Sequence, residues 1–510
     1  MAYSVVFAAA INGNKAELVE VETDISSGLP IFQIVGYLAA EVKESTQRVR
    51  TAIKALGLRL PPRRILVNIS PATIRKRGPA FDLPIVATVL CALGELPEAL
   101  LENVLIIGEI GLDGSVKGVT GVLAMLIEAK KRGLARCVIP RDNYEEARLL
   151  TDLKVVVIDH IEELKTVLSE EPEVSQKLRL PRKRPSTVTD FRDISGQEMA
   201  KRALEIAVSG GHNLLMIGPP GGGKTLLAKS IPSILPALSE EEILELTSIY
   251  SIAGSLSKDR PHIYERPFRS VNHTATSTAI LGGGTFPRAG EATLAHRGVL
   301  FLDELTEFRK GVLECLREPL EEKQILLIRQ QNTYLFPADF LLVGACNPCP
   351  CGNYPDRNLC QCTEVEISHY LRRLSDPFLD RMDISIQVPK VPIEELQKKE
   401  RGKPSATYRK RVLACLRRQE KRYQSEGLIR NGNLQIRQIK KYCGLSPAGE
   451  ALMAQAYDRL DLTVRSYHKV LKVARTIADL DGCEKIEEAH LLEALGYRLN
   501  LKQADEGVRV

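Results

Sequence analysis

The chain has 510 residues, which is too long for one ordinary domain and favours a division into about three domains. Hydrophobic residues make up 44% of the chain and charged residues 26%, and this balance excludes a wholly disordered protein. The net charge of +6 is small beside 70 basic and 64 acidic residues, so a polyanionic partner is permitted and not required. No apolar run approaches the roughly 20 residues that a membrane span needs. We therefore expect a cytoplasmic protein with no membrane partner.

The first 168 residues mix strand and helix patterns, and we interpret 1–168 as an N-terminal α/β domain. Apolar runs and helical periodicity predict strands at Phe32–Val35, Ile65–Asn68 and Val155–Ile158, and helices at Glu41–Leu56 and Val122–Arg132. Prolines and basic side chains dominate the following segment, and we expect an exposed linker at 169–189. Contact with nucleic acid is the alternative interpretation of its basic residues.

A glycine-rich loop between a predicted strand at His212–Ile217 and a predicted helix is the most specific motif of the chain. It fits G-x-x-x-x-G-K-[ST] at every fixed position with Gly218, Pro219, Pro220, Gly221, Gly222, Gly223, Lys224 and Thr225. The glycines allow successive backbone N–H groups to face the phosphates of ATP, and the helix adds its positive N-terminal end. Lys224 is expected to reach the β- and γ-phosphates, and the Thr225 hydroxyl to bind Mg²⁺. Strands and helices alternate onward, which predicts a parallel-sheet domain at 190–392.

Polar residues follow two further predicted strands of this domain. Four apolar residues lead to Asp303 and Glu304, which places both carboxylates at the carboxyl edge of the sheet, where ligands bind. Asp303 suits the Mg²⁺ shell, and Glu304 can orient and polarise the attacking water. Asn347 ends the next strand and can hydrogen-bond the γ-phosphate or that water. Arg381 follows a predicted helix and can act on the nucleotide of a neighbouring subunit; a surface ion pair with an adjacent aspartate is the alternative.

Four of the 11 cysteines fall within 14 residues, as Cys349, Cys351, Cys360 and Cys362. Four thiolates grouped in this way can close a tetrahedral structural Zn²⁺ site. The C-x-C spacing is tighter than the usual C-x₂₋₄-C, and Cys346 is an alternative ligand because it lies three residues before Cys349. Reduced thiols without metal and a redox switch are the competing interpretations.

These motifs together resemble those of the AAA+ ATPases. The glycine-rich loop resembles Walker A, the Asp303–Glu304 pair Walker B, Asn347 sensor 1 and Arg381 the arginine finger. Arg465, in the C-terminal part of the chain, matches sensor 2 of the branch that holds magnesium-chelatase motors and helicases of the MCM type. The whole chain further resembles the Mg-chelatase-like ComM/YifB family of bacterial AAA+ proteins. The stretches that carry this resemblance are Ile34–Gly36, Val42–Ser45, Gly78–Pro84 and Asn347–Gly352.

The resemblance implies an α/β chain with a Lon-protease-like α/β N-terminal domain, an AAA+ P-loop α/β core and a C-terminal α-helical lid at 393–502. It also implies an ATP-driven homo-hexameric motor that acts on single-stranded or branched DNA. Helicase activity or branch migration in homologous recombination or natural transformation is the implied role, with recombination proteins as possible partners. A chelatase-type or protein-remodelling ATPase is the alternative, because it would share every ATPase residue named above.

A peptidase is a further alternative, and the residues argue against it. A Lon-type site needs a serine nucleophile that a lysine activates. By the resemblance, Ala80 stands at the serine position and Leu123 at the lysine position. Ser45, Ser70 and Lys76 remain for a rebuilt dyad, but a scaffold or interaction domain is the better interpretation.

Two insertions of the core are candidates for contact with DNA. Apolar runs at Ile325–Ile328 and Tyr334–Phe336, with a turn at Gln330–Thr333, predict a hairpin. In AAA+ proteins of the chelatase and MCM branch, such a hairpin before sensor 1 points into the central pore. We expect Lys323 and Arg329 to contact phosphates. A second insertion at His273–Arg288 resembles the helix-2 insert of that branch, and packing between subunits is the alternative role for both.

Overall fold

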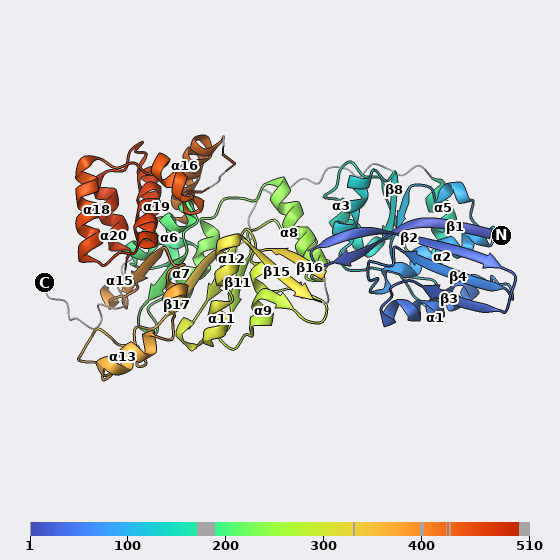
Figure 1. Ribbon diagram of the computed structural model, residues 1–510, viewed down its shortest axis with the longest axis horizontal. Coiled ribbons are helices and arrows are strands. Elements are labelled where there is room, and N and C mark those ends of the chain that lie inside the picture. The colour runs from blue at the N-terminus through green and yellow to red at the C-terminus, as the bar shows by residue number, and fades with distance from the viewer. Residues whose placement is uncertain are drawn as a thin grey trace.

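A computed structural model of the chain describes residues 2–170, 189–329, 332–397, 402–424, 426–427 and 430–498. These residues form an N-terminal α/β unit, a central α/β unit and a C-terminal helical unit along the long axis of the molecule (Figure 1). Nearly all of the expected linker, and the two residues at the tip of the predicted hairpin, lie outside the described residues. Within the described ranges, no helix combines the length and the apolar character that crossing a membrane requires.

A seven-stranded mixed sheet forms the centre of the N-terminal unit. In sheet order the strands are β3 (Ile31–Val35), β4 (Arg64–Ser70), β2 (Lys15–Ser26), β1 (Ala2–Asn12), β5 (Val104–Ile106), β8 (Arg136–Pro140) and β9 (Val155–Ile158). β1 and β2 form an antiparallel hairpin, whereas β5, β8 and β9 add to β1 in parallel. Successive side chains of a strand face opposite sides. Val6 and Ala8 accordingly join one hydrophobic cluster and Ala9 joins the other.

Helices cover both faces of this sheet. On one face, the side chains of α1 (Ala40–Ala55), α2 (Asp82–Ala92) and α5 (Leu164–Ser169) join one hydrophobic cluster. On the other face, α3 (Val122–Arg132) joins the second cluster. α2 is buried almost throughout, which explains its nearly continuous apolar sequence. The predicted strands and helices of this region are present, with ends that differ by at most a few residues.

The central unit is built on a five-stranded parallel sheet. Its strands, in sheet order, are β11 (Phe268–Val271), β14 (Val299–Leu302), β17 (Leu341–Cys346), β10 (Leu214–Ile217) and β18 (Ile384–Gln387). The four residues of β10 are all buried and alternate between two clusters, Leu214 and Met216 on one side and Leu215 and Ile217 on the other. Burial on both faces explains why these strands are uniformly apolar. The expected α/β class, with a parallel-sheet domain in this part of the chain, is confirmed.

Helices and two small hairpins surround the central sheet. The helices are α6 (Glu198–Gly210), α7 (Lys224–Ser230), α8 (Glu240–Ile252), α9 (Ser277–Leu281), α10 (Glu291–Leu294), α11 (Lys310–Glu314), α12 (Arg317–Glu322), α13 (Glu364–Leu371), α14 (Asp376–Leu379) and α15 (Ile393–Gln397). One hairpin joins β12 (Gly282–Gly283) to β13 (Arg288–Ala289). The other pairs β15 (Gln324–Arg329) with β16 (Asn332–Pro337), where the sequence predicts a hairpin.

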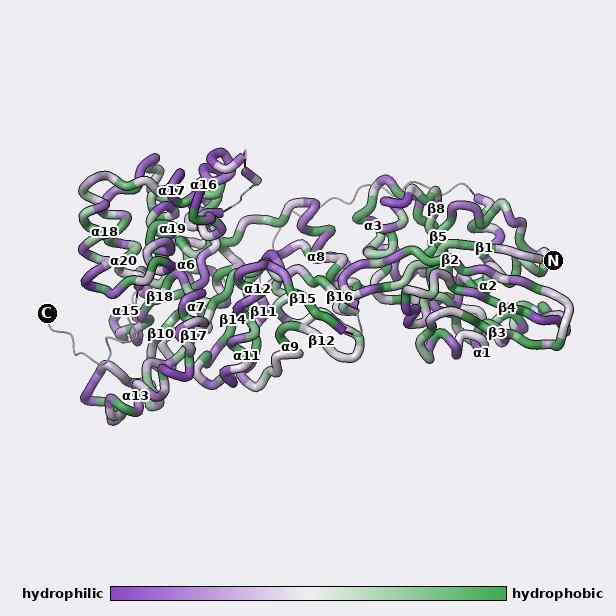
Figure 2. Tube along the Cα trace, in the orientation of Figure 1, coloured by the Kyte–Doolittle hydropathy of each residue, from purple (hydrophilic) through white to green (hydrophobic). Residues whose placement is uncertain are grey.

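The C-terminal unit is helical. It comprises α16 (Ser405–Tyr423), α17 (Ile436–Tyr442), α18 (Pro447–Arg459), α19 (Val464–Asp481) and α20 (Glu488–Gly496). Its buried side chains share one hydrophobic cluster with α6 and one face of the central sheet. Hydrophobic residues gather along the strands of both sheets, whereas α16 is largely hydrophilic (Figure 2). The lid therefore packs directly on the core domain.

The N-terminal unit packs on the core through α3 and α8. The backbone N–H of Gly121 donates to the carbonyl of Ser251 at 3.1 Å. The hydroxyl of Ser251 in turn donates to the buried carboxyl group of Glu146. At the edge of this contact, Lys258 pairs with Asp142 at 2.8 Å. These bonds place the N-terminal unit beside α8, at the end of the core remote from the lid (Figure 1).

Candidate functional site

The glycine-rich loop connects β10 to α7 at the carboxyl edge of the core sheet. A Cβ at Gly218 would lie 2.1 Å from the carbonyl oxygen of Val388, so the loop can begin only with glycine. The Lys224 ammonium donates to the carbonyls of Gly218 and Pro219 at 2.6 and 3.0 Å, and to Asn347 Oδ1 at 3.1 Å. The structure thus brings Lys224 and Asn347 together, and the ammonium is held by loop carbonyls at the place where phosphate oxygens bind in such loops.

Thr225 and Asp303 also meet. The Thr225 hydroxyl donates to Asp303 Oδ2 at 2.8 Å, and the other oxygen of Asp303 accepts the backbone N–H of Glu304 at 3.0 Å. A hydroxyl and a carboxylate this close to a phosphate loop are the oxygen ligands that Mg²⁺ uses together with substrate phosphates. Burial lowers the pKa of Lys224, whereas Cys346, Asp303 and Glu304 favour its charged form. The residues present therefore fit a nucleotide with its magnesium ion.

Glu304 has an unusual backbone and a partner that the sequence did not predict. Its φ is +53°, in the left-handed region, and residues held there at a cost of roughly 1–3 kcal/mol cluster at functional sites. His273 Nδ1 lies 2.9 Å from Glu304 Oε2. His273 comes two residues after β11, the strand next to β14. The position of His273 just after a predicted strand could have indicated a site residue. The order of strands along the chain, however, does not reveal which strands are neighbours in the sheet.

Arg381 and Arg465 are brought together at the opposite edge of the core sheet. Both guanidinium groups bond the Glu321 carboxylate, Arg381 at 2.6 Å. The carbonyl of Arg381 accepts the side-chain amide of Asn213 at 2.9 Å, and Asn213 directly precedes β10. The two arginines are therefore separated from Lys224 of the same chain by the length of β10. They line a cavity of about 1010 Å³ between the core and the lid.

Glu321 is the second functional candidate that sequence reasoning missed. Burial opposes its ionisation, but the hydrogen bond from Arg465 and the charge of Arg381 outweigh burial and lower the pKa of Glu321. Arg381 is the more enclosed arginine, with a side chain 9% exposed against 46% for Arg465. One carboxylate shared by two guanidinium groups leaves an excess of positive charge. This arrangement suits an incoming phosphate.

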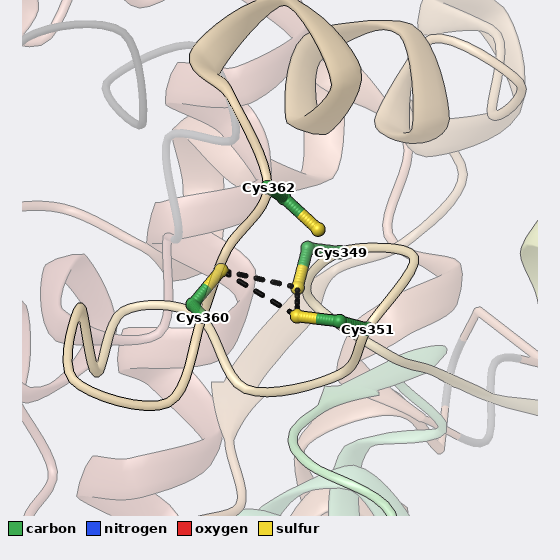
Figure 3. Close-up of side chains that lie close together, drawn as sticks. All are labelled: Cys349, Cys351, Cys360 and Cys362. Carbon is green, nitrogen blue, oxygen red and sulfur yellow. Dashed lines mark hydrogen bonds between the residues drawn. The ribbon is translucent and has the colours of Figure 1, made fainter.

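The four-cysteine loop gathers its thiols at one point (Figure 3). Cys349 Sγ lies 3.3 Å from Cys351 Sγ and 3.8 Å from Cys360 Sγ, and the four sulfur atoms lie within 4.8 Å of one another. A Zn–S bond of about 2.3 Å in a tetrahedron implies S···S separations of about 3.8 Å, so these residues fit zinc. The Asn353 N–H and the neighbouring thiols lower the pKa of Cys351 to about 6. Cys346 lies outside the group, and burial raises its pKa to about 12.

The cysteine loop also touches the nucleotide loop. Gly352 follows Cys351 and has a φ of +80°. A Cβ at Gly352 would lie 2.4 Å from Pro220 Cδ, so glycine is required by both backbone and space. The thiol cluster is thereby connected to the phosphate-binding loop through one direct contact, in addition to its connection along the chain to Asn347.

In the N-terminal unit, the two positions that align with a Lon-type dyad are buried. Ala80 and Leu123 lie in the same apolar cluster and are 6% and 0% exposed. Ser45 is buried and donates to Asp82, whereas Lys76 is buried and donates to the carbonyl of Pro71. The hydrogen bonds of Ser45 and Lys76 thus lead to different partners, and burial lowers the pKa of Lys76 to about 8.

Family models match most of the chain. The model described as magnesium chelatase, subunit ChlI, matches residues 190–396, subunit ChlI of Mg-chelatase matches 21–143, and the ChlI C-terminal model matches 402–498. The uncharacterized protein YifB of Salmonella typhimurium is 40% identical over 499 residues, which are 98% of this chain and 97% of that protein. The competence protein ComM of Haemophilus influenzae is 38% identical over 504 residues, 98% of each chain.

A more distant likeness covers part of the chain. Lon protease 2 of Bacillus subtilis is 27% identical over 196 residues, which are 34% of this chain and 35% of that protein. With full-length relatives near 40% identity and a P-loop, Walker B pair and sensor 1 asparagine assembled at one sheet edge, the chain belongs to the Mg-chelatase-like family of AAA+ ATPases that includes YifB and ComM.

Proposed function

We propose that this protein is an ATP-driven hexameric motor that acts on DNA. The observation that carries the ATPase part is the convergence of Lys224, Thr225, Asp303 and Asn347 on one loop, with Glu304 beside them. Positioning and charge are most of what phosphoryl transfer requires from a protein. The DNA part is supported by the full-length similarity to a competence protein of Haemophilus influenzae and by the hairpin that carries the exposed Arg329, described below.

The chain's own residues define the steps at the nucleotide. Lys224 leaves its loop carbonyls for the β- and γ-phosphate oxygens, and the loop N–H groups bind the same oxygens. Mg²⁺, held by Thr225 and Asp303, would neutralise charge on the phosphates. Glu304 orients the water in line with the γ-phosphate and accepts its proton, and Asn347 hydrogen-bonds the γ-phosphate or that water. His273 fixes the direction of the Glu304 carboxylate before ATP arrives.

Arg381 and Arg465 serve a neighbouring subunit in this proposal. Within one chain both lie at the amino edge of the sheet, remote from Lys224. A heterologous interface whose rotation closes forms a ring, in which one edge of each subunit meets the opposite edge of the next. The two guanidinium groups then exchange the Glu321 carboxylate for the neighbour's γ-phosphate. This exchange couples hydrolysis to assembly.

The hairpin β15–β16 is the best candidate for contact with DNA in the pore. Lys323, just before the hairpin, forms an ion pair with Asp339 at 3.5 Å. The carboxylate of Asp339 therefore offsets part of the positive charge of Lys323. Arg329 is exposed at the tip, and its hydrogen bond goes to the carbonyl of the adjacent Ile328. Arg329 is therefore the more available cation for a phosphate.

The first test is the rate of ATP hydrolysis with and without single-stranded, duplex and branched DNA. We expect stimulation by at least one DNA form, and less stimulation after Arg329→Ala, which leaves the nucleotide site untouched. Lys310→Ala, on α11, is the matched control for loss of one exposed positive charge. Equal rates with and without every DNA form would favour a chelatase-type or protein-remodelling ATPase.

We further propose a structural Zn²⁺ in the four-cysteine loop. Cys349, Cys351, Cys360 and Cys362 would ligate it, and the sulfur separations support this assignment. Through Gly352 against Pro220, the metal would stiffen the nucleotide loop. In this proposal the zinc has four protein ligands and takes no part in phosphoryl transfer.

The protein purified without chelator is expected to contain about one zinc per chain, because a structural site uses four protein ligands. Replacing Cys349 and Cys351 with serine should remove the zinc, lower the melting temperature and weaken ATP binding without abolishing hydrolysis. Cys91→Ser with Cys315→Ser removes two half-buried thiols outside the cluster and is the control. Absence of zinc by metal analysis, or a double variant that melts and binds ATP as the wild type does, would contradict the proposal.

A further inference from the structure

Two arginines of the N-terminal unit stack on an aromatic ring of the core. The Arg77 guanidinium carbon lies 3.3 Å, and that of Arg75 4.5 Å, from the ring centre of Phe286. Phe286 lies between β12 and β13, in the insertion that the sequence analysis singled out. Arg75 also lies 5.4 Å from the ring centre of Tyr37, whose side chain is 43% exposed. Cation–π contacts thus bring two positive groups to the seam between the units.

The positive charges at this contact between the two units have no ion-pair partner among the residues that the structure describes. Among the described residues, no carboxylate lies within 4.0 Å of Arg75, Arg77 or the exposed Arg288 of β13. The Nε atoms of Arg75 and Arg77 are buried and have no hydrogen-bond partner in the described part of the chain. Burial lowers the pKa of Arg77, the charges of Arg75 and Arg288 add to this, and Glu41 opposes it. Three like charges with so little compensation favour an anionic ligand.

We propose that Arg75, Arg77 and Arg288, with the Tyr37 and Phe286 rings, form a binding site for the phosphodiester backbone of single-stranded nucleic acid. The inference rests on the proposed function and assigns it a surface that the two units build jointly. We call this surface the arginine seam.

The chemistry of the seam favours single-stranded nucleic acid over an acidic polypeptide. Guanidinium forks bind phosphates through two parallel hydrogen bonds. Tyr37 is an exposed ring next to them, and stacking of bases on such rings beside a basic groove is how proteins bind single strands without sequence preference. An acidic polypeptide has no planar base at each phosphate-like charge to stack on that ring.

The seam lies next to the hairpin β15–β16. A Cβ at Gly13, in the turn between β1 and β2, would lie 3.0 Å from Tyr334 Cδ1 of β16. The seam and the hairpin that carries Arg329 are therefore adjacent. Single-stranded DNA bound at the seam would therefore lie next to the hairpin that we propose as a DNA contact.

The test is the salt dependence of single-stranded DNA binding by the full chain, with oligo-dT as the probe. Arg75→Ala with Arg77→Ala should lower affinity by roughly tenfold or more near 0.1 M salt and reduce the slope of log K against log salt by about 1.4, since each lost phosphate contact contributes about 0.7. Arg75→Lys with Arg77→Lys should keep most of the slope. ATP binding should be unchanged in both variants.

Lys54→Ala with Arg59→Ala is the matched control, because it removes two exposed charges of the same unit. Glu41, whose charge acts on Arg77, stands at the end of α1 opposite Lys54, about 20 Å away. Lys54 is therefore remote from the seam, and the slope should not change. Arg288→Ala alone, which removes an exposed side chain and leaves the stacked pair intact, should reduce the slope by about 0.7.

Several results would overturn the inference. Binding and slope equal to the wild type in the double alanine variant, with a lower melting temperature, would show that the arginines only dock the two units. Polyglutamate that competes as well as oligo-dT would reassign the seam to acidic polypeptides. Wild-type protein that binds no DNA would refute the proposed function itself, whereas DNA binding that survives loss of the arginines refutes the seam alone.

Discussion

Replacing Glu304 with glutamine is expected to slow ATP hydrolysis by about 10²–10⁴-fold, the usual contribution of a positioned general base. ATP binding should persist, because Lys224, Thr225 and Asp303 hold the phosphates and the metal independently of Glu304. Glutamine keeps the size of the side chain but cannot accept the proton of the attacking water. Single-turnover hydrolysis and equilibrium binding of a fluorescent ATP analogue measure the two effects separately.

Two further variants make this experiment decisive. Lys224→Ala should lose ATP binding as well as hydrolysis, because no other ammonium group occupies the loop among the residues that the structure describes. Glu307→Gln makes the same chemical change three residues away, where the side chain pairs with Arg373 at 3.1 Å, and should keep the wild-type rate. Hydrolysis by Glu304→Gln at the rate of Glu307→Gln would show that another group positions the water.

The sequence predicted the helices and strands that depend on the pattern of neighbouring residues along the chain. The helix at Val122–Arg132 and the strand at Val155–Ile158 are found with the predicted ends. The strand expected at His212–Ile217 begins two residues later, at Leu214. His212 instead turns into the interface with the lid, where its Nε2 lies 2.7 Å from Thr476 Oγ1. A long-range polar partner of that kind cannot be anticipated from a short apolar run.

The candidate site divides in the same way. Lys224, Thr225 and Asp303 were predicted because the motif encodes backbone geometry and residue type at fixed spacing. His273 and Glu321 were missed because their roles depend on strand order and on α12 meeting the lid, which are tertiary facts. The thiol cluster lies between these cases. Its four members were evident from spacing, whereas the contact of Gly352 with Pro220 needed coordinates.

Glu321 suggests how the arginine edge is kept ready before a ring forms. Two guanidinium groups beside each other repel, and burial of Arg381 with Arg465 nearby lowers the pKa of Arg381. The shared carboxylate offsets part of this repulsion in the single chain and leaves one positive charge in excess. Because Glu321 is itself 42% exposed, a phosphate can displace it without a large rearrangement. In the ring that we propose, this exchange places both arginines on a γ-phosphate that belongs to the next subunit.

Mixing two inactive variants should therefore restore hydrolysis. Arg381→Ala alone is expected to lose about 10³–10⁵-fold in rate, the contribution of an arginine finger, and Glu304→Gln alone is slowed for the reason given above. In randomly mixed rings, an intact Glu304 site meets a neighbour with an intact Arg381 at about one interface in four, so about a quarter of the wild-type rate should return if each interface acts independently.

The controls for mixing follow from the same geometry. Arg372→Ala removes an exposed arginine at the end of α13 and should be active alone. A mixture of Arg381→Ala with Lys224→Ala should also recover, since the Lys224→Ala subunit still presents Arg381 to its neighbour. The double variant Glu304→Gln, Arg381→Ala mixed with Glu304→Gln should stay inactive, because no subunit then has a working base. Failure of the first mixture to recover in rings of demonstrated mixed composition, or full activity of a monomeric wild-type chain, would mean that Arg381 acts within its own subunit or not on the nucleotide at all.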